Sequence, residues 1–248
     1  DAGRTDDGHH YFAMELVEGQ PIDKFCDQHR LSVHQRLLLA YRLCDAVEHA
    51  HQRGVLHRDI KPGNVIASTM GSQTKLKVID FGIAKSLGAA SIAGEEAETK
   101  LGQIIGTPAY MSPEQADLRN DEVDRRADVY SIGVLIYKLL TGTTPLRTES
   151  LNGKTLTEVL QVISTFDAER PSSRVRSLDS QSSSLLAEKL SSDATSLYRM
   201  LRSELDWLVL KAVHNDRRSR YASADELGKD IRRYLDHQPI LAIAGSYS

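Results

Sequence analysis

Residues 57–64 read His57-Arg58-Asp59-Ile60-Lys61-Pro62-Gly63-Asn64, and residues 80–82 read Asp80-Phe81-Gly82. Within the first stretch, Asp59 offers a proton acceptor in a loop, and Lys61 offers a positive point charge of the kind that binds phosphate. This combination suits phosphoryl transfer, because that reaction depends on positioning and charge neutralisation more than on covalent chemistry.

Two short strands are predicted between these motifs, at residues 65–67 and 76–79, with turn-forming residues 68–72 between them. Residues 64 and 80 are equidistant from residue 72. A hairpin would therefore bring Asn64 and Asp80 side by side at its open end. An amide oxygen beside a carboxylate suits a hard cation such as Mg²⁺, with Mn²⁺ as an alternative.

The two motifs resemble the H-R-D-x-x-x-x-N catalytic loop and the D-F-G metal motif of protein kinases. Residues 106–114 read G-T-P-A-Y-M-S-P-E and resemble the end of the activation segment in bacterial Hanks-type serine/threonine kinases, although Ser112 stands where that family usually has alanine. Residues 11–236 resemble the hinge and C-terminal lobe in segment order. The resemblance implies transfer of the γ-phosphoryl group of ATP to Ser/Thr hydroxyls of a protein substrate.

The resemblance also implies roles for single residues. Asp59 would accept or orient the proton of the substrate hydroxyl, and Lys61 would neutralise charge on the transferring phosphate. Thr107 would bond Asp59 and Lys61, while Asn64 and Asp80 would hold the Mg²⁺ that accompanies ATP. Any one of these residues alone is more simply a solvated loop or turn residue, so the prediction depends on their spacing.

The nucleotide would bind between the hinge and the predicted hairpin. Met14 resembles the gatekeeper, the backbone groups of Glu15 and Val17 would bond the adenine edge, and Ile66 would pack beneath it. Filling of the core is an equally good description of Met14.

Other family residues have structural roles. His57 and Phe81 would stack in an internal hydrophobic spine, and Asp128 would accept hydrogen bonds from the backbone of residues 57–58. Glu114 and Arg220 would form a buried ion pair that ties the activation segment to the C-terminal helices. Without the resemblance, surface charge would be the simpler interpretation of Glu114 and Arg220.

Regulation by phosphorylation is a further hypothesis. A phosphate on Thr99 would meet Arg58 and Lys85 and order the loop, because it adds about −1.5 to −2 charge. Ser86 and Ser91 are the next candidates. Two kinase molecules in a dimer could phosphorylate each other at Thr99.

Composition sets broad limits. The 248 residues are 40% hydrophobic and 26% charged, with a net charge of −3, which gives no reason to expect nucleic acid or an anionic membrane as a partner. Cys26 and Cys44 lie in apolar helical patterns and are predicted to be buried thiols. No signal peptide is apparent, and the apolar run at residues 129–140 is too short to span a bilayer, so we expect a cytoplasmic location.

The predicted fold is α+β and mainly α: a kinase-like C-terminal lobe with a small hairpin at the catalytic site. Residues 1–20 would be a remnant of the N-lobe strands and hinge, including a strand at 11–17, and residues 237–248 a tail. Within the lobe at 21–236, a serine-rich insertion at about 171–200 is expected to be exposed and weakly ordered. Helix starts are predicted at four capping pairs: Ser32/Gln35, Thr155/Glu158, Ser203/Asp206 and Ser223/Glu226.

The sequence contains no G-x-G-x-x-G phosphate loop. The loop, the lysine that clamps the phosphates and its glutamate partner are expected upstream, so these 248 residues alone should have negligible activity. Two alternatives stay open: a pseudokinase-like or truncated lobe acting as a binding scaffold, and a small-molecule phosphotransferase with a kinase-like core. Peptide acceptors tested against aminoglycoside or choline acceptors would separate the last alternative.

Overall fold

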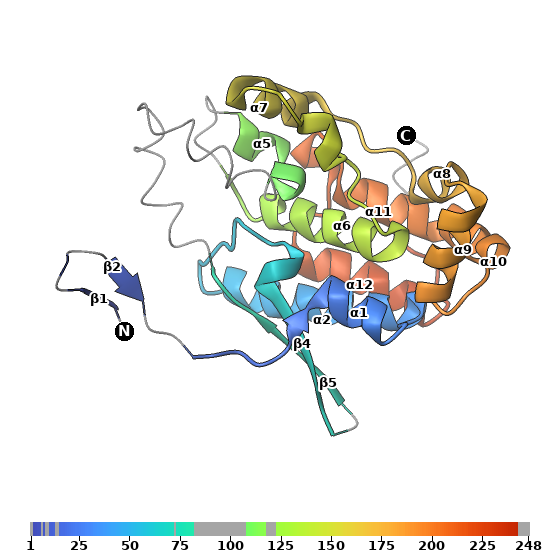
Figure 1. Cartoon of the computed structure of the whole chain (residues 1–248), viewed down its shortest axis with the longest axis horizontal. Helices are drawn as coiled ribbons and strands as arrows, with labels where there is room; N and C mark the ends of the chain where they lie inside the picture. The colour runs from blue at the N-terminus through green and yellow to red at the C-terminus, as the bar shows by residue number, and fades with distance from the viewer. Residues whose placement is uncertain are drawn as a thin grey trace.

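The computed structural model describes residues 2–5, 7, 10–12, 15–71, 73–81, 108–117 and 123–242. The elements follow one another along the chain as β1 Ala2–Arg4, β2 His10–Phe12, β3 Gln20–Pro21, α1 Ile22–Gln28, α2 Val33–His51, η1 Pro62–Asn64, β4 Val65–Met70, β5 Gln73–Val78, η2 Pro108–Tyr110, α5 Pro113–Ala116, α6 Arg126–Thr141, η3 Thr148–Leu151, α7 Leu156–Thr165, α8 Pro171–Arg176, α9 Ser180–Lys189, α10 Ala194–Met200, η4 Leu201–Leu205, α11 Asp206–Ala212, η5 Arg217–Ser219 and α12 Ala224–Leu235. Helices dominate, and the β4–β5 ribbon projects from the helical body (Figure 1).

The core of the helical body forms around α6, in which almost every residue is buried. Helices α2 and α11 both pack against α6, and α12 packs along α2. Gly133 permits the close approach of α6 to α11, because a Cβ at this position would lie 2.7 Å from the Cβ of Ala212. The prediction of a mainly α fold with a small hairpin is confirmed.

The predicted helix starts at Ser32, Thr155 and Ser223 are confirmed, and the first two form complete capping boxes. Ser32 with Gln35 and Thr155 with Glu158 each exchange side-chain and backbone hydrogen bonds. At α12, Ser223 accepts from the amide of Glu226, but the Glu226 carboxylate accepts from the amide of Ala222 at 2.8 Å.

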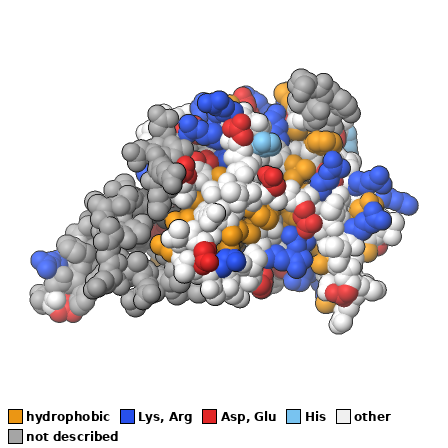
Figure 2. Space-filling model, turned by 90° about the horizontal axis from the view of Figure 1, so that it is seen from above, with side chains coloured by type: hydrophobic (Ala, Val, Ile, Leu, Met, Phe, Trp, Pro, Cys, Tyr) orange, Lys and Arg blue, Asp and Glu red, His pale blue; other side chains and the backbone are white. Residues whose placement is uncertain are grey.

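Charged side chains of both signs are interspersed on the face drawn in Figure 2.

The predicted hairpin forms, but its register differs from the prediction by one residue. Strands β3, β4 and β5 make an antiparallel sheet in which Val65 pairs with Val78. Asn64 therefore lies opposite Ile79, whose amide donates to the Asn64 carbonyl at 2.9 Å. The turn is centred between residues 71 and 72 and includes Gly71 with φ of +61°, so the symmetry about residue 72 was wrong.

The serine-rich insertion is ordered, which corrects the expectation of weak order. Helices α8, α9 and α10 span most of residues 171–200. Three leucines of this segment are buried in the main core: Leu186, Leu190 and Leu197. Periodic leucines thus outweigh the polar composition, since buried apolar area offsets the entropy of ordering.

One other expectation is wrong in detail, because strand β2 ends at Phe12 and residues 15–18 form no strand. The helical path breaks at Ser203, which has non-helical angles (φ −85°, ψ −133°), so a helix boundary lies at the predicted residue. The Ser203 hydroxyl does not cap the following helix, because it donates to the carbonyl of Met200 at 2.7 Å. Among the described residues, no helix is long and apolar enough to span a membrane.

Candidate active site

Asp128, in the first turn of α6, anchors the loop that precedes β4. Its carboxylate is 1% exposed and accepts from the backbone amides of His57 at 2.8 Å and Arg58 at 2.7 Å. Arg58 has φ of +63°, a conformation that costs an L-residue about 1–2 kcal/mol. The two hydrogen bonds offset this strain, and the predicted anchoring role of Asp128 is confirmed.

His57 has a structural role, as predicted. Its Nδ1 accepts from the amide of Asp59 at 3.3 Å, so the ring proton is on Nε2, which donates to the carbonyl of Ile79 at 3.0 Å. The ring also packs on Phe81 with centroids 4.7 Å apart. Both ring nitrogens are therefore occupied by backbone groups, which leaves no nitrogen to act as a general base.

Asp59, Lys61 and Asn64 converge at the end of this loop. Lys61 Nζ lies 2.8 Å from Asp59 Oδ2, and Asn64 Nδ2 lies 3.2 Å from the same oxygen. Asn64 Nδ2 also donates to the Asp59 carbonyl at 2.8 Å, which fixes the orientation of the amide. The turn η1, with Pro62 at its first position, brings Asn64 back toward Asp59.

Asn64 and Asp80 suit a hard cation by the chemistry of their donors. Asn64 is 6% exposed, and its amide nitrogen donates to both the carbonyl and the carboxylate of Asp59. The amide oxygen of Asn64 is therefore the atom left to face a metal. Asp80 follows Ile79 with φ of +56°, which ends the ladder and leaves its side chain exposed. An amide oxygen and an exposed carboxylate at the end of one hairpin are donors that Mg²⁺ accepts while it keeps water and phosphate ligands.

The predicted nucleotide side of the site is the segment before β3. Glu15 is exposed and pairs with Lys77 of β5 at 2.5 Å, a contact that lowers the pKa of the Glu15 carboxyl. Val17 is partly buried, and Ile66 lies on β4 opposite Pro21. The β-sheet thus ties this segment to the catalytic hairpin.

Several predicted residues lie outside the described part of the chain. They are Met14, Gly82, Lys85, Ser86, Ser91, Thr99 and Thr107.

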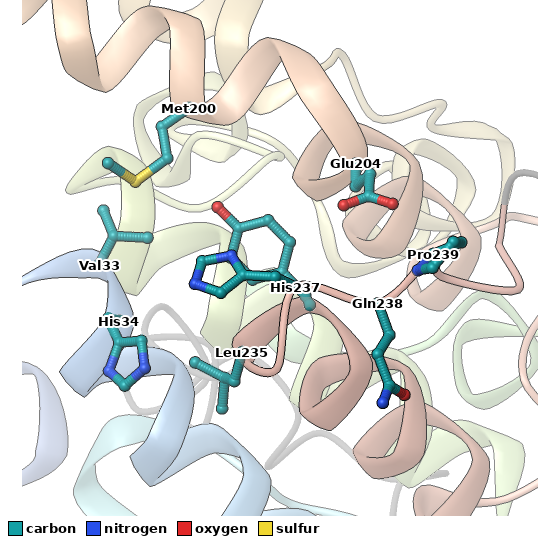
Figure 3. Close-up of a pocket in the computed structure, with 9 residues that line it drawn as sticks. Val33, His34, Met200, Glu204, Leu235, His237, Gln238 and Pro239 are labelled. Atoms are coloured by element: carbon teal, nitrogen blue, oxygen red, sulfur yellow. The ribbon is translucent and has the colours of Figure 1, made fainter.

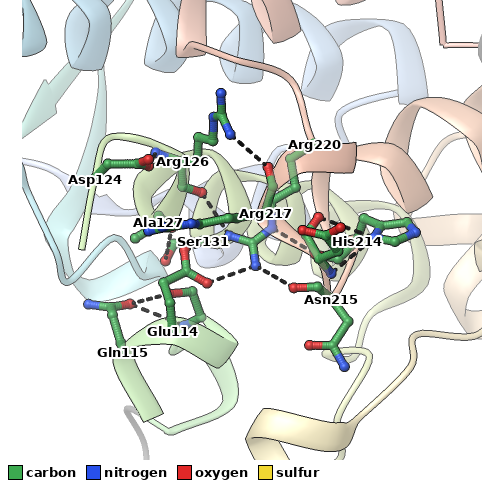
Figure 4. A network of polar contacts seen from close by, with 12 residues as sticks. Glu114, Gln115, Asp124, Arg126, Ala127, Ser131, His214, Asn215, Arg217 and Arg220 are labelled. Carbon is green, nitrogen blue, oxygen red and sulfur yellow. Dashed lines mark hydrogen bonds and ion pairs between the residues drawn. The ribbon is translucent and has the colours of Figure 1, made fainter. Parts of the chain in front are cut away.

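The predicted Glu114–Arg220 pair is confirmed (Figure 4). The guanidinium forms two bonds to the carboxylate, at 2.7 and 2.8 Å, and the two side chains are 0% and 5% exposed. Arg220 also donates to backbone carbonyls, including that of His214 at 2.6 Å, and covers the ring of Tyr130 at 4.9 Å. Burial raises the pKa of the Tyr130 hydroxyl to about 12, although Arg220 opposes this shift. The pair fixes α5 on α6 and η5.

The contacts of two residues that support the loop were not predicted from the sequence. His51 Nε2 lies 2.7 Å from Asp128 Oδ2 and adds a third contact to the anchoring carboxylate. Gln115 Nε2 donates to the carbonyl of Arg58 at 2.9 Å and connects α5 to the loop. A histidine at a helix end and a glutamine in a capping box have local roles of their own, so only the fold shows these contacts.

Comparison with known proteins agrees with this geometry. Residues 4–229 match the protein kinase domain family. The chain belongs to this family. It is 34% identical over 238 residues to a probable serine/threonine-protein kinase of Streptomyces coelicolor, which covers 94% of this chain and 29% of that protein. It is 33% identical over 230 residues to serine/threonine-protein kinase PknB of Mycobacterium leprae, with 92% and 31% covered.

A solved structure shows the same fold. The PknI kinase domain of Mycobacterium tuberculosis superposes with a TM-score of 0.59 at 21% identity, over 94% of this chain and 69% of that one. The chain spans about a third of the length of these two curated relatives.

Proposed function

We propose that the protein is a serine/threonine kinase that transfers the γ-phosphoryl group of ATP to hydroxyls of a protein substrate. The supporting observation is the convergence of Lys61 and Asn64 on one oxygen of Asp59, in a loop anchored by buried Asp128. The relatives named above are serine/threonine kinases, which favours the same chemistry here.

In this proposal, the Asp59 carboxylate accepts the proton of the attacking hydroxyl, and Lys61 lies beside it to neutralise the transferring phosphate. Asn64 and Asp80 would hold Mg²⁺, which supplies charge neutralisation between the phosphates when it is bound. Asn64 has a second role, because its amide nitrogen holds both the backbone and the side chain of Asp59. In this proposal, the reaction occurs at the open end of the β4–β5 hairpin.

The test is peptide phosphorylation by the intact protein with Mg²⁺ and ATP, compared with its Asp59→Asn variant. Removal of a general base should lower kcat by about 10²–10⁴-fold. Asp167→Asn changes an exposed aspartate in the same way and should leave the rate unchanged. A rate within a few-fold of wild type in Asp59→Asn would contradict the proposal, as would phosphorylation of aminoglycosides or choline in preference to peptides.

Regulation by phosphorylation is the finer part of the proposal. Arg58 Nε is buried and has no hydrogen-bond partner among the described residues, so this guanidinium could receive a phosphate on Thr99. In the assay above, mass spectrometry should find phosphothreonine 99 in active wild type and none in Asp59→Asn. Active protein without this modification would contradict the regulatory role and leave the kinase assignment intact.

A further inference from the structure

A cavity lies in the helical body, away from the hairpin. It has a volume of about 570 Å³ and is bounded by the start of α2, the end of α10 with η4, and the end of α12 with the residues that follow it. Figure 3 shows Val33 and Met200 on one side of the opening, Leu235 below, and Glu204, Gln238 and Pro239 on the other side. This volume is within the range that small organic ligands occupy.

The lining combines an apolar surface with one full charge. Val33, Met200, Leu235 and Pro239 supply apolar area, and among the nine lining residues Glu204 is the only acidic, lysine or arginine side chain. The charge is positioned by the main chain, because Glu204 Oε1 accepts from the amide of Ile240 at 3.3 Å. An anionic ligand would be repelled here, whereas a cation would be attracted.

The remaining polar groups of the cavity suit an ammonium group. His34 and His237 add two imidazole rings to the lining, and Tyr234 offers an aromatic ring. Burial raises the pKa of the Tyr234 hydroxyl, and the nearby Glu204 carboxylate adds to this effect. Carboxylate, imidazole and phenol therefore surround one space.

The backbone at His237 is unusual. The amide of His237 donates to the carbonyl of Tyr234 at 3.1 Å and that of Gln238 to Arg233 at 2.8 Å, which is a Schellman motif after α12. His237 has φ of +56°, at the position where glycine is preferred. A histidine here is conformationally unfavourable, yet its ring lies in the cavity.

The opposite wall also departs from regular helix. The helical path is kinked at Ser203, which has non-helical angles (φ −85°, ψ −133°), and Glu204 follows this kink and lines the cavity. Irregular backbone thus presents the cavity's charged group on one side and an imidazole on the other.

We propose that this cavity binds a small amphipathic amine: an apolar body that fills the space lined by Val33, Met200 and Leu235, and a single ammonium head that pairs with Glu204. The ligand is distinct from the nucleotide and the protein substrate, and its binding does not depend on the kinase proposal.

Three probes with the same body and different heads test the charge preference: 4-phenylbutylamine, 4-phenylbutanol and 4-phenylbutyrate. Calorimetric or NMR titration of the 248-residue chain at neutral pH should give the tightest binding for the amine, by about five- to tenfold over the alcohol. The carboxylate should bind least. Equal affinities, tighter binding of the carboxylate, or no saturable binding of any probe at millimolar concentration would overturn the proposal.

Two variants assign the effect to residues. Glu204→Gln should abolish the preference for the amine over the alcohol, while Glu188→Gln, an exposed glutamate of α9, should keep it. His237→Gly should raise Tm, because glycine tolerates the left-handed backbone, and should weaken amine binding at the same time. A preference that survives Glu204→Gln, or unchanged amine affinity in His237→Gly, would contradict the proposal.

Discussion

The catalytic loop at 57–64 and the serine-rich segment at 171–200 obtain their order in opposite ways. In the loop, Arg58 adopts a left-handed backbone held by a carboxylate that is 70 residues away in sequence. In the serine-rich segment, Asp179 accepts from the amide of Ser182 and Asp193 from that of Ser196, each only three residues away. Long-range contacts impose the first conformation, and local caps start the second.

This difference explains where prediction from sequence worked. The identities of Asp59, Lys61 and Asn64 revealed the family, although Arg58 beside them adopts a backbone conformation that goes against local preference. The helices of the serine-rich segment start at local caps and bury leucines, but the polar composition of the segment concealed this pattern. A positive φ alone does not distinguish the two regions, because Ser191 in the serine-rich segment also has φ of +49°.

The largest expected effect comes from removal of the loop's long-range anchor. Asp128→Ala leaves the amides of His57 and Arg58 and the ring of His51 without their buried acceptor, so the free energy of unfolding should fall by about 3–5 kcal/mol. Chemical denaturation measures the loss, and amide hydrogen exchange of His57 and Arg58 locates it.

Asp167→Ala is the control, because this aspartate is exposed. If Asp128→Ala kept both the wild-type stability and slow exchange at His57, the loop would not depend on this anchor. The contrast between a loop ordered by a long-range contact and a serine-rich segment ordered by local caps would then not hold.

The second test addresses the serine-rich segment. Leu197 of α10 is 0% exposed and lies in the main core, so Leu197→Ala should cost about 2–5 kcal/mol of stability. Leu185 of α9 is 54% exposed, and Leu185→Ala should change stability by less than about 0.5 kcal/mol. Equal, small effects of the two substitutions would mean that the segment is not part of the folded core.

Much of the site could be predicted because it depends on residue types at fixed spacing. Helix starts at Ser32 and Thr155 followed from capping boxes, and the pairing of Glu114 with Arg220 followed from the family. The one-residue register shift at Asn64 and Asp80 could not be predicted, because it depends on whether the turn closes over the two residues 71–72 or over a longer loop. The contact of His51 with Asp128 required the packing of α2 on α6.

The smallest expected effect concerns the cap of α10. The side-chain and backbone hydrogen bonds from Ser196 lower the pKa of the Asp193 carboxyl, so the cap contributes stability above the ordinary aspartate pKa of about 3.9 and loses it as the pH falls through the lowered value. Asp193→Ala should therefore be less stable than wild type at pH 7 and approach it in strong acid. Asp193→Asn retains an oxygen acceptor that neither titrates nor carries charge, so its stability relative to Asp193→Ala should not change with pH. Parallel denaturation series of the three proteins would reveal this, and a difference between Asp193→Ala and wild type that stayed constant with pH would show that the carboxylate charge is not what caps the helix.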